Sequence, residues 1–176
     1  MAARGKPKKL DADALWHYAL RILGQRAQSV GELRQKLSRR AVSTVDLNTA
    51  MAKLREYDLI DDEKFSEAFA SARLQNQGFG RFRVLRELRS KRVAPTVAEG
   101  AVEKTFASTD ESALIRQFLD RKYRGKNLPE FLKEEKNLAS AYRRLRTAGF
   151  SSSGSLSVLK NYANAEQDWS EPEEND

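Results

Sequence analysis

The 176-residue sequence contains no cysteine. Disulfide bonds, thiolate metal ligands and a cysteine nucleophile are therefore excluded, and a reducing compartment is expected. No apolar run approaches the length that crosses a bilayer, and the basic N-terminus leads into Leu10 and Asp11 without the apolar core of a signal peptide. We expect a soluble, cytoplasmic protein that does not interact with membranes.

The sequence also lacks the residue combinations of common active sites. The only histidine, His17, stands between two aromatic residues with no nucleophile motif nearby, so we expect it to be partly buried and structural. Asp61 and Asp62 would point apart on a helix, so they suit a helix start better than a metal site. Gly78-Phe79-Gly80 lacks the ending of a phosphate-binding loop and predicts a turn. No enzymatic activity, cofactor or metal is expected.

Basic residues outnumber acidic ones, and the excess is unevenly distributed. The chain has 32 Lys and Arg against 25 Asp and Glu, but residues 166–176 hold six acids and no base. Residues 1–165 therefore carry a net charge of +13 (32 basic less 19 acidic side chains). A net charge this high favours an acidic partner for residues 1–165, either the phosphates of a nucleic acid or an acidic protein surface. The acidic tail is too polar to pack and is expected to be disordered.

Apolar residues recur at helical spacing in three successive groups of helices, and no segment alternates like a strand. In the first group Ser29-x-x-Glu32 forms a capping box, and Ser43 or Thr44 precedes the third helix. The expected buried residues of this group are Leu15, Tyr18, Ala19, Ile22, Leu23, Val30, Leu33, Leu37, Val45, Leu47, Ala50, Met51 and Leu54.

The second group begins at Asp61 and Asp62, and the third is looser. In the second, Phe65, Ala68, Phe69 and Ala72 are expected on the buried face, and Thr96-x-x-Glu99 is a further capping box after Ala94-Pro95. A shared spacing of five residues supports the repetition, because stacked helical units each need the same apolar anchor. It joins Leu37 to Val42, Leu88 to Val93, and Leu145 to Phe150.

These patterns predict an all-α protein of three tandem three-helix repeats that form an elongated, curved solenoid. The predicted division has a basic disordered N-terminus, three repeats with an insertion of uncertain structure in the third, and an acidic disordered tail. The corresponding ranges are 1–11, 12–58, 59–107, 108–164 with the insertion near 124–136, and 165–176.

The middle helix of each repeat is rich in basic residues. In the second repeat Arg83, Arg86 and Arg89 form a stripe opposite Val84, Leu85 and Leu88, which suits forked hydrogen bonds to successive carboxylates or phosphates. An ordinary solvated face is about as good an interpretation of any single stripe. The candidate partner- or DNA-binding residues, inferred from charge, are Arg34, Lys36, Arg39, Arg40, Arg81, Arg83, Arg86, Arg89, Lys91, Arg92, Arg143, Arg144 and Arg146.

Three stretches resemble the RecX family of bacterial regulatory proteins. They run from Ala19 to Leu37, from Tyr57 through Asp61-Asp62-Glu63-Lys64 to Phe65, and from Gly80 to Lys91. In the third repeat, Arg121-Lys122-Tyr123 and Ala148-Gly149-Phe150 also resemble the family, but more weakly. The chain departs from the family pattern at Ala41 and Arg92, where glycine is frequent.

The resemblance implies a non-enzymatic protein that binds the RecA recombinase filament and suppresses its ATPase, strand-exchange and coprotease activities. Weak binding to single- and double-stranded DNA and a monomeric state are expected with it. Two alternatives remain: a non-specific nucleic-acid-binding helical protein that acts by occupying DNA, and a helical adaptor for an unrelated acidic protein.

Overall fold

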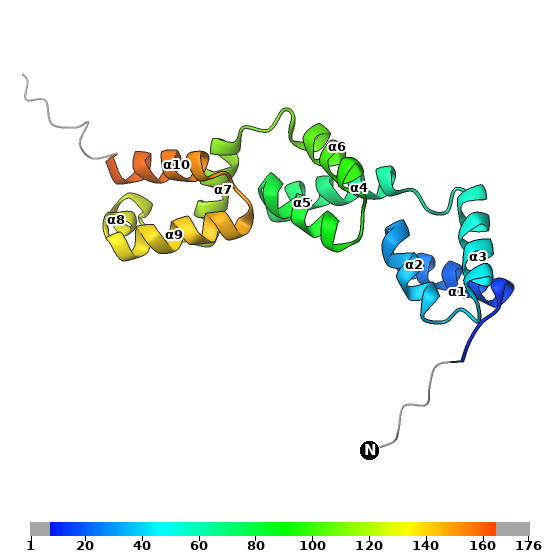
Figure 1. Ribbon diagram of the computed structural model, residues 1–176. Helices are drawn as coiled ribbons and strands as arrows, with labels where there is room; N and C mark the ends of the chain where they lie inside the picture. Colours follow the sequence, from blue (N-terminus) through cyan, green and yellow to red (C-terminus); the bar gives the residue numbers. More distant parts are fainter. Residues whose placement is uncertain (1–7, 165–176) are drawn as a thin grey trace, which may run out of the picture. The chain divides into compact units, whose positions relative to one another are not determined.

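The computed structural model describes residues 8–164, a range that holds ten α-helices, one π-helical turn and no strand (Figure 1). The predicted disordered tail lies outside the described residues. In chain order the helices are α1 (Ala12–Gln25), α2 (Val30–Ser38), α3 (Thr44–Glu56), α4 (Asp62–Ala72), the π-helical turn (Arg73–Gln77), α5 (Arg81–Ser90), α6 (Pro95–Phe106), α7 (Glu111–Lys122), α8 (Leu128–Lys133), α9 (Glu135–Ala148) and α10 (Ser152–Asn164).

The all-α class and the tandem helical repeats are confirmed. α1–α3 form the first repeat, α4–α6 the second and α7–α10 the third. The described residues also divide into two compact units: unit 1 comprises 8–69 and Glu87–Ala101, and unit 2 comprises Ala70–Arg86 and 102–164. Both units therefore contain part of the middle repeat, and the domain boundaries near residues 58 and 107 stay a prediction.

Unit 1 has a core built from α1, α2 and α3. Leu15, Leu33, Leu37, Met51 and Leu54 are fully buried in it. The three helices start where capping chemistry places them, because each N-cap side chain accepts a hydrogen bond from an otherwise unpaired backbone N–H. The acceptors are Asp11 (from Ala14), Ser29 (from Glu32) and Ser43 (from Asp46).

Unit 2 has its own core among α7, α8, α9 and α10, where Phe118 meets Phe150 edge to face at 5.5 Å between ring centroids. The predicted insertion contributes to this core. Residues 128–133 form α8, and its Leu128 and Leu132 are buried. Pro129 stands in the first turn, where its missing N–H costs nothing. The third repeat therefore has four helices rather than three.

The expected disorder of residues 1–11 extends too far along the chain. Leu10 forms an isolated parallel bridge with Ala41, donating to the carbonyl of Arg40 at 2.7 Å and accepting from Val42 at 2.9 Å. Asp11 caps α1. These hydrogen bonds fix Leu10 and Asp11, whereas residues 1–7 lie outside the described range.

The five-residue spacing holds in two repeats and is wrong in the first. Val93 and Phe150 are buried, but Val42 is 63% exposed and Ala41 is buried in its place. The reason is a different turn. The second and third repeats leave their middle helices through a left-handed residue, Arg92 (φ 63°) and Gly149 (φ 93°), whereas the first has none and reaches the core one residue earlier.

Besides Val42, three further expected core positions are exposed. Val45 lies 74% exposed in the first turn of α3, and Ala68 and Ala72 of α4 also face outward. The buried positions of α4 are Ser66 and Ala70, with Phe65 and Phe69 only half-buried. Alanine carries too little apolar area to fix the orientation of a helix, so the neighbouring helices decide which face is buried.

Candidate functional site

The basic residues of α2 divide into exposed and partly buried groups. Arg34 is exposed and donates to the side chain of Asn48 on α3 at 2.9 Å, and Arg39 is exposed. Lys36 is half-buried, and its ammonium donates to the amide oxygen of Gln28 at 2.6 Å. Arg34 on α2 and Arg39 directly after it are therefore the cations of this segment best placed to meet a partner.

Arg40 has a packing role instead. Its guanidinium lies 5.1 Å from the ring centre of Tyr18 on α1, which also carries Arg21 at 5.2 Å. The cation–π contact holds Arg40 half-buried against the helix core. His17, the preceding residue of α1, is exposed, so the expectation that it is partly buried is wrong.

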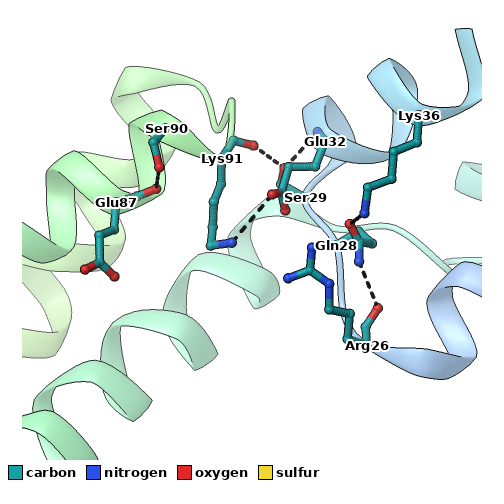
Figure 2. A network of polar contacts seen from close by, with 8 residues as sticks. All are labelled: Arg26, Gln28, Ser29, Glu32, Lys36, Glu87, Ser90 and Lys91. Carbon is teal, nitrogen blue, oxygen red and sulfur yellow. Dashed lines mark hydrogen bonds and ion pairs between the residues drawn. The ribbon is translucent and has the colours of Figure 1, made fainter. Parts of the chain in front are cut away.

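Lys91 joins the end of α5 to α2 (Figure 2). Its ammonium lies 3.5 Å from the Glu32 carboxylate and 5.3 Å from the ring centre of Phe69. The Ser29 hydroxyl donates to the backbone carbonyl of Lys91 while accepting from the N–H of Glu32. The predicted capping box is therefore only half formed, because the Glu32 carboxylate binds Lys91 rather than returning to its own helix start.

Gly31 fits closely beside this network. A Cβ at Gly31 would collide with the backbone carbonyl and the Cβ of Arg92, which is exposed and holds the left-handed conformation. Arg92 therefore packs its backbone against α2 and directs its charge outward.

Arg89 is paired within unit 1. Its guanidinium donates to the Glu99 carboxylate of α6 at 2.7 Å, and both side chains are about half exposed. The predicted capping box from Thr96 to Glu99 is wrong, because α6 begins at Pro95 and Thr96 is already helical. Proline suits the first helical position because its fixed φ is already helical and it has no N–H there to leave unpaired.

In unit 2 the start of α5 lies beside the end of α9. Gly80 and Gly149 have no room for a Cβ, since each would collide with backbone of the other segment. The N–H of Phe82 donates to the Gly149 carbonyl at 3.1 Å, and Arg86 donates to the Thr147 carbonyl at 3.4 Å. Part of the predicted set, from α5 and α9, is thus brought together.

Arg83 departs from the predicted exposed stripe. It is half-buried, and its guanidinium lies 3.6 Å from the ring centre of Phe79. Arg81 and Arg86 remain exposed on α5. Together with the pairing of Arg89, these contacts show that the three arginines of the stripe have three different environments.

The basic residues of α9 are all exposed. Arg144 lies 5.5 Å from the ring centre of Tyr123, and Arg146 donates to the carbonyl of Phe150. Arg143 projects from the neighbouring position of the same helix. Of the three predicted site residues of α9, Arg143 and Arg144 therefore make no hydrogen bond to the backbone of the next segment within residues 8–164.

A hollow of about 680 Å³ in unit 2 gathers cations from three helices. Arg121 and Lys122 at the end of α7 were not predicted as site residues and lie here with Arg83 and Arg144. The sequence did not reveal them because charges on separate helices have no common spacing. The only signal was that Arg121-Lys122-Tyr123 weakly resembles the family's third repeat. The lining, as far as the structure describes it, is Asn76, Gln77, Phe79, Arg83, Phe118, Arg121, Lys122, Arg144, Thr147 and Ala148.

Asp61 and Asp62 act in helix capping and packing. The Asp61 carboxylate accepts from the N–H groups of Lys64 at 3.0 Å and Glu63 at 2.9 Å. These bonds, above all that from Lys64, lower the pKa of Asp61. Asp62 accepts from the N–H of Val30 at 2.8 Å, but its burial is the larger effect and raises its pKa.

Among residues 8–164, no group of three or more metal-ligating side chains could hold a metal ion. The described helices also include none with the length and apolarity needed to cross a membrane.

Residues 61–102 match the family model described as "RecX, second three-helix domain". This range lies inside the predicted second repeat.

Relatives and a solved structure agree with the match. The chain is 32% identical over 112 residues to the Regulatory protein RecX of Halorhodospira halophila, covering 64% of this chain and 68% of that protein. It is 26% identical over 113 residues to the Regulatory protein RecX of Caldanaerobacter subterraneus, covering 64% of this chain but only 57% of that protein. The crystal structure of RecX from Lactobacillus salivarius shares the fold with a TM-score of 0.65 at 18% identity, covering 86% and 96% of the two chains. The chain belongs to the RecX family of regulatory proteins.

Proposed function

We propose that this protein is a negative regulator of the RecA recombinase that binds the RecA–DNA filament and suppresses its ATPase, strand-exchange and coprotease activities. Membership in the RecX family is the observation that carries the proposal. The candidate contact residues of this proposal are predicted cations that are exposed and lie on, or directly after, the middle helix of each repeat: Arg34, Arg39, Arg81, Arg86, Arg143 and Arg144.

In this proposal inhibition is a matter of binding, not catalysis. Many modest contacts, spread over several repeats, add up to a stable complex because each later contact forms at a high effective concentration. Bound protein then blocks filament growth or the subunit motions linked to ATP hydrolysis. The same proposal takes the protein to be a cytoplasmic monomer without enzymatic activity of its own.

The second candidate function is non-specific binding of nucleic acid, which would affect recombination by occupying DNA. The net charge of +7 favours it as well as the filament proposal. Salt dependence does not separate the two, since both depend on counterion release.

An ATPase assay with added bare single-stranded DNA separates them. Recombinase filaments, with all of the recombinase already bound to DNA, are first inhibited by this protein. Bare single-stranded DNA is then titrated into the assay. If the filament is the preferred partner, inhibition persists at a several-fold excess of bare strand. Recovery of ATPase in proportion to the added strand would instead support simple occupancy of DNA.

A further inference from the structure

The cationic hollow of unit 2 has a strongly positive lining. Four of its ten lining residues are basic, and none is acidic. Clustered cations repel one another, so their arrangement favours an occupant that brings several negative charges at once. The basic residues are Arg83, Arg121, Lys122 and Arg144.

Aromatic rings hold two of the guanidinium groups of the hollow in place. Arg83 lies over Phe79 at 3.6 Å from the ring centre, and Arg144 lies 5.5 Å from the ring centre of Tyr123. Ordered guanidinium groups lose little side-chain entropy when they bind an anion. An acidic segment that reaches the hollow therefore meets cations that are already positioned.

The same chain carries an acidic segment shortly after α10. Residues 166–176 hold six carboxylates and no base, and one aromatic residue, Trp169, stands among them. Asp168 directly precedes Trp169, and Glu171 follows two positions later. Carboxylates bind guanidinium and ammonium groups, and an indole ring offers its face to a cation. The segment therefore matches the hollow in charge and through its aromatic residue.

The last turn of α10 lies near the end of α7, whose cations line the hollow. Tyr162 of α10 packs against the core of unit 2, and its pKa is raised mainly by burial and further by the negative charge of Asp120 on α7. Asp120 and Arg121 line a second hollow of about 560 Å³. Arg121 also lines the cationic hollow, so the two hollows meet at this residue.

The acidic segment is long enough to follow this path. Trp169 lies five positions after Asn164, the last residue of α10, and an extended chain spans at most about 3.6 Å per residue, or about 18 Å over this stretch. Arg121 and Lys122 follow Asp120 on α7 with a rise of only about 1.5 Å per residue. The acids around Trp169 can therefore reach the hollow without any change in the described helices.

From these observations we infer that the cationic hollow of unit 2 is the docking site of the chain's own acidic segment, residues 166–176. Its carboxylates pair with Arg121, Lys122 and Arg144, and the ring of Trp169 lies against the guanidinium of Arg83. A polyanionic partner of these cations then has to displace the segment, so the contact weakens such binding from within the chain. This inference goes beyond the proposed function, because the contact forms without recombinase or DNA.

The test follows the fluorescence of Trp169 in the full chain without any partner. The sequence has two tryptophans, so Trp16→Phe leaves Trp169 as the only one. Quenching by acrylamide, which is uncharged, then measures how accessible the indole ring is to solvent. Circular dichroism verifies that each variant keeps its helices.

Two charge variants are compared in this background. Lys122→Glu/Arg144→Glu, the hollow variant, reverses two exposed cations of the cationic hollow. Lys136→Glu/Arg143→Glu, the control variant, reverses two exposed cations of α9 that line neither hollow. Because the change in net charge is the same, a difference between the two variants reports the position of the charges.

Trp169 is expected to be shielded from acrylamide at low salt in the parent and in the control variant. The hollow variant should weaken docking about tenfold and expose Trp169, because two attractive contacts become repulsive. About 1 M NaCl should expose Trp169 in all three proteins, since the screening length falls to about 3 Å. Equal accessibility in the hollow and control variants, or in the parent at low and high salt, would overturn the inference.

Carbodiimide cross-linking locates the segment directly, since it joins a carboxylate to an ammonium group in contact with it. Lys122 is the only lysine among the described lining residues of the cationic hollow. Mass spectrometry should find residues 166–176 joined to Lys122, with a yield that does not depend on protein concentration. Equal yields at Lys122 and Lys136 would contradict a fixed docking site. A yield that rises with concentration would show that the segment binds a second copy, and would overturn a contact within one chain.

Discussion

Lys91 and Glu32 form an ion pair between the turn that follows α5 and the first turn of α2, 3.5 Å apart with side chains only 19% and 20% exposed. The partners are 59 positions apart in the sequence and belong to different repeats. Phe69 covers the ammonium at 5.3 Å, and the Glu32 oxygen Oε2 is buried without a hydrogen-bond partner among the described residues. The pair is therefore partly desolvated, and losing one member leaves the other charge poorly solvated.

Replacing one member should cost more than replacing both. Glu32→Gln is expected to lower the free energy of unfolding by about 1–2 kcal/mol, since Lys91 then remains half-buried without its counter-ion. Lys91→Met should have a similar effect, and the double variant should recover about 1 kcal/mol of the summed loss. Urea unfolding of the four proteins gives these values; additive losses would mean that the two side chains do not interact.

Replacement by alanine is predicted to destabilise the protein more at Gly149 than at Gly125, although both glycines have similar φ angles. Gly149 (φ 93°) would place a Cβ against the backbone of Arg83, whereas Gly125 (φ 82°) has open space around it. Gly125→Ala should cost about 1 kcal/mol from backbone strain alone. Gly149→Ala adds a collision in unit 2 and should cost about 2 kcal/mol more. Equal losses in urea unfolding would contradict the close packing of α5 on the end of α9.

The neighbouring carboxyls of Asp61 and Asp62 should affect stability with opposite pH dependence. The pKa of Asp61 is lowered in the folded chain, so its contribution is present above the unfolded-state pKa and is lost as the pH falls through the folded value. The pKa of Asp62 is raised, mainly by burial, so its contribution is present below the unfolded-state pKa and is lost as the pH rises through the folded value.

Asparagine substitutions separate the two carboxyls. Asp61→Asn should be more harmful at pH 7 than at pH 3, whereas Asp62→Asn should be better tolerated at pH 7 than at pH 3, because the amide keeps an acceptor for Val30 without a buried charge. The measurement is the midpoint of urea unfolding at both pH values. Parallel pH profiles for the two variants would show that the carboxyls share one environment.

Exposed arginines of α5 are expected to contribute to inhibition of the recombinase. Arg81→Glu/Arg86→Glu should raise the concentration needed for half-inhibition of the filament ATPase by about tenfold, since two attractive contacts become repulsive. Arg116→Glu/Lys160→Glu, with the same charge change at exposed positions of α7 and α10, serves as the control. If both variants inhibit equally well while folded, this part of α5 lies outside the contact surface.

Local chemistry made much of the helical fold predictable. Capping residues such as Ser29, Ser43 and Asp61 place helix starts because their side chains satisfy free backbone amides within three residues. The helix ends at Gly78 and Gly149 were also predictable from local chemistry, since glycine reaches the left-handed conformation at little cost. These effects act between neighbours in the chain and need no knowledge of the tertiary structure.

Features that depend on packing between distant segments were not predictable. Ala41 is buried where Val42 was expected, because the turn after α2 has no left-handed residue and Ala41 pairs with Leu10. The ion pair of Glu32 with Lys91 and the gathering of Arg121 with Arg144 join residues from separate helices. Charge in the sequence identifies helices that could bind a polyanion, but only packing decides which charges meet one another and which remain exposed.

Sedimentation of this protein with preformed recombinase filaments is the measurement that tests the central claim most directly. The filament is assembled on single-stranded DNA with a non-hydrolysable ATP analogue, and a matched sample contains the same DNA without recombinase. We predict that the protein co-sediments with the filament at concentrations where bare DNA retains at least about tenfold less of it. Equal retention on bare DNA, or no retention on the filament, would contradict the account.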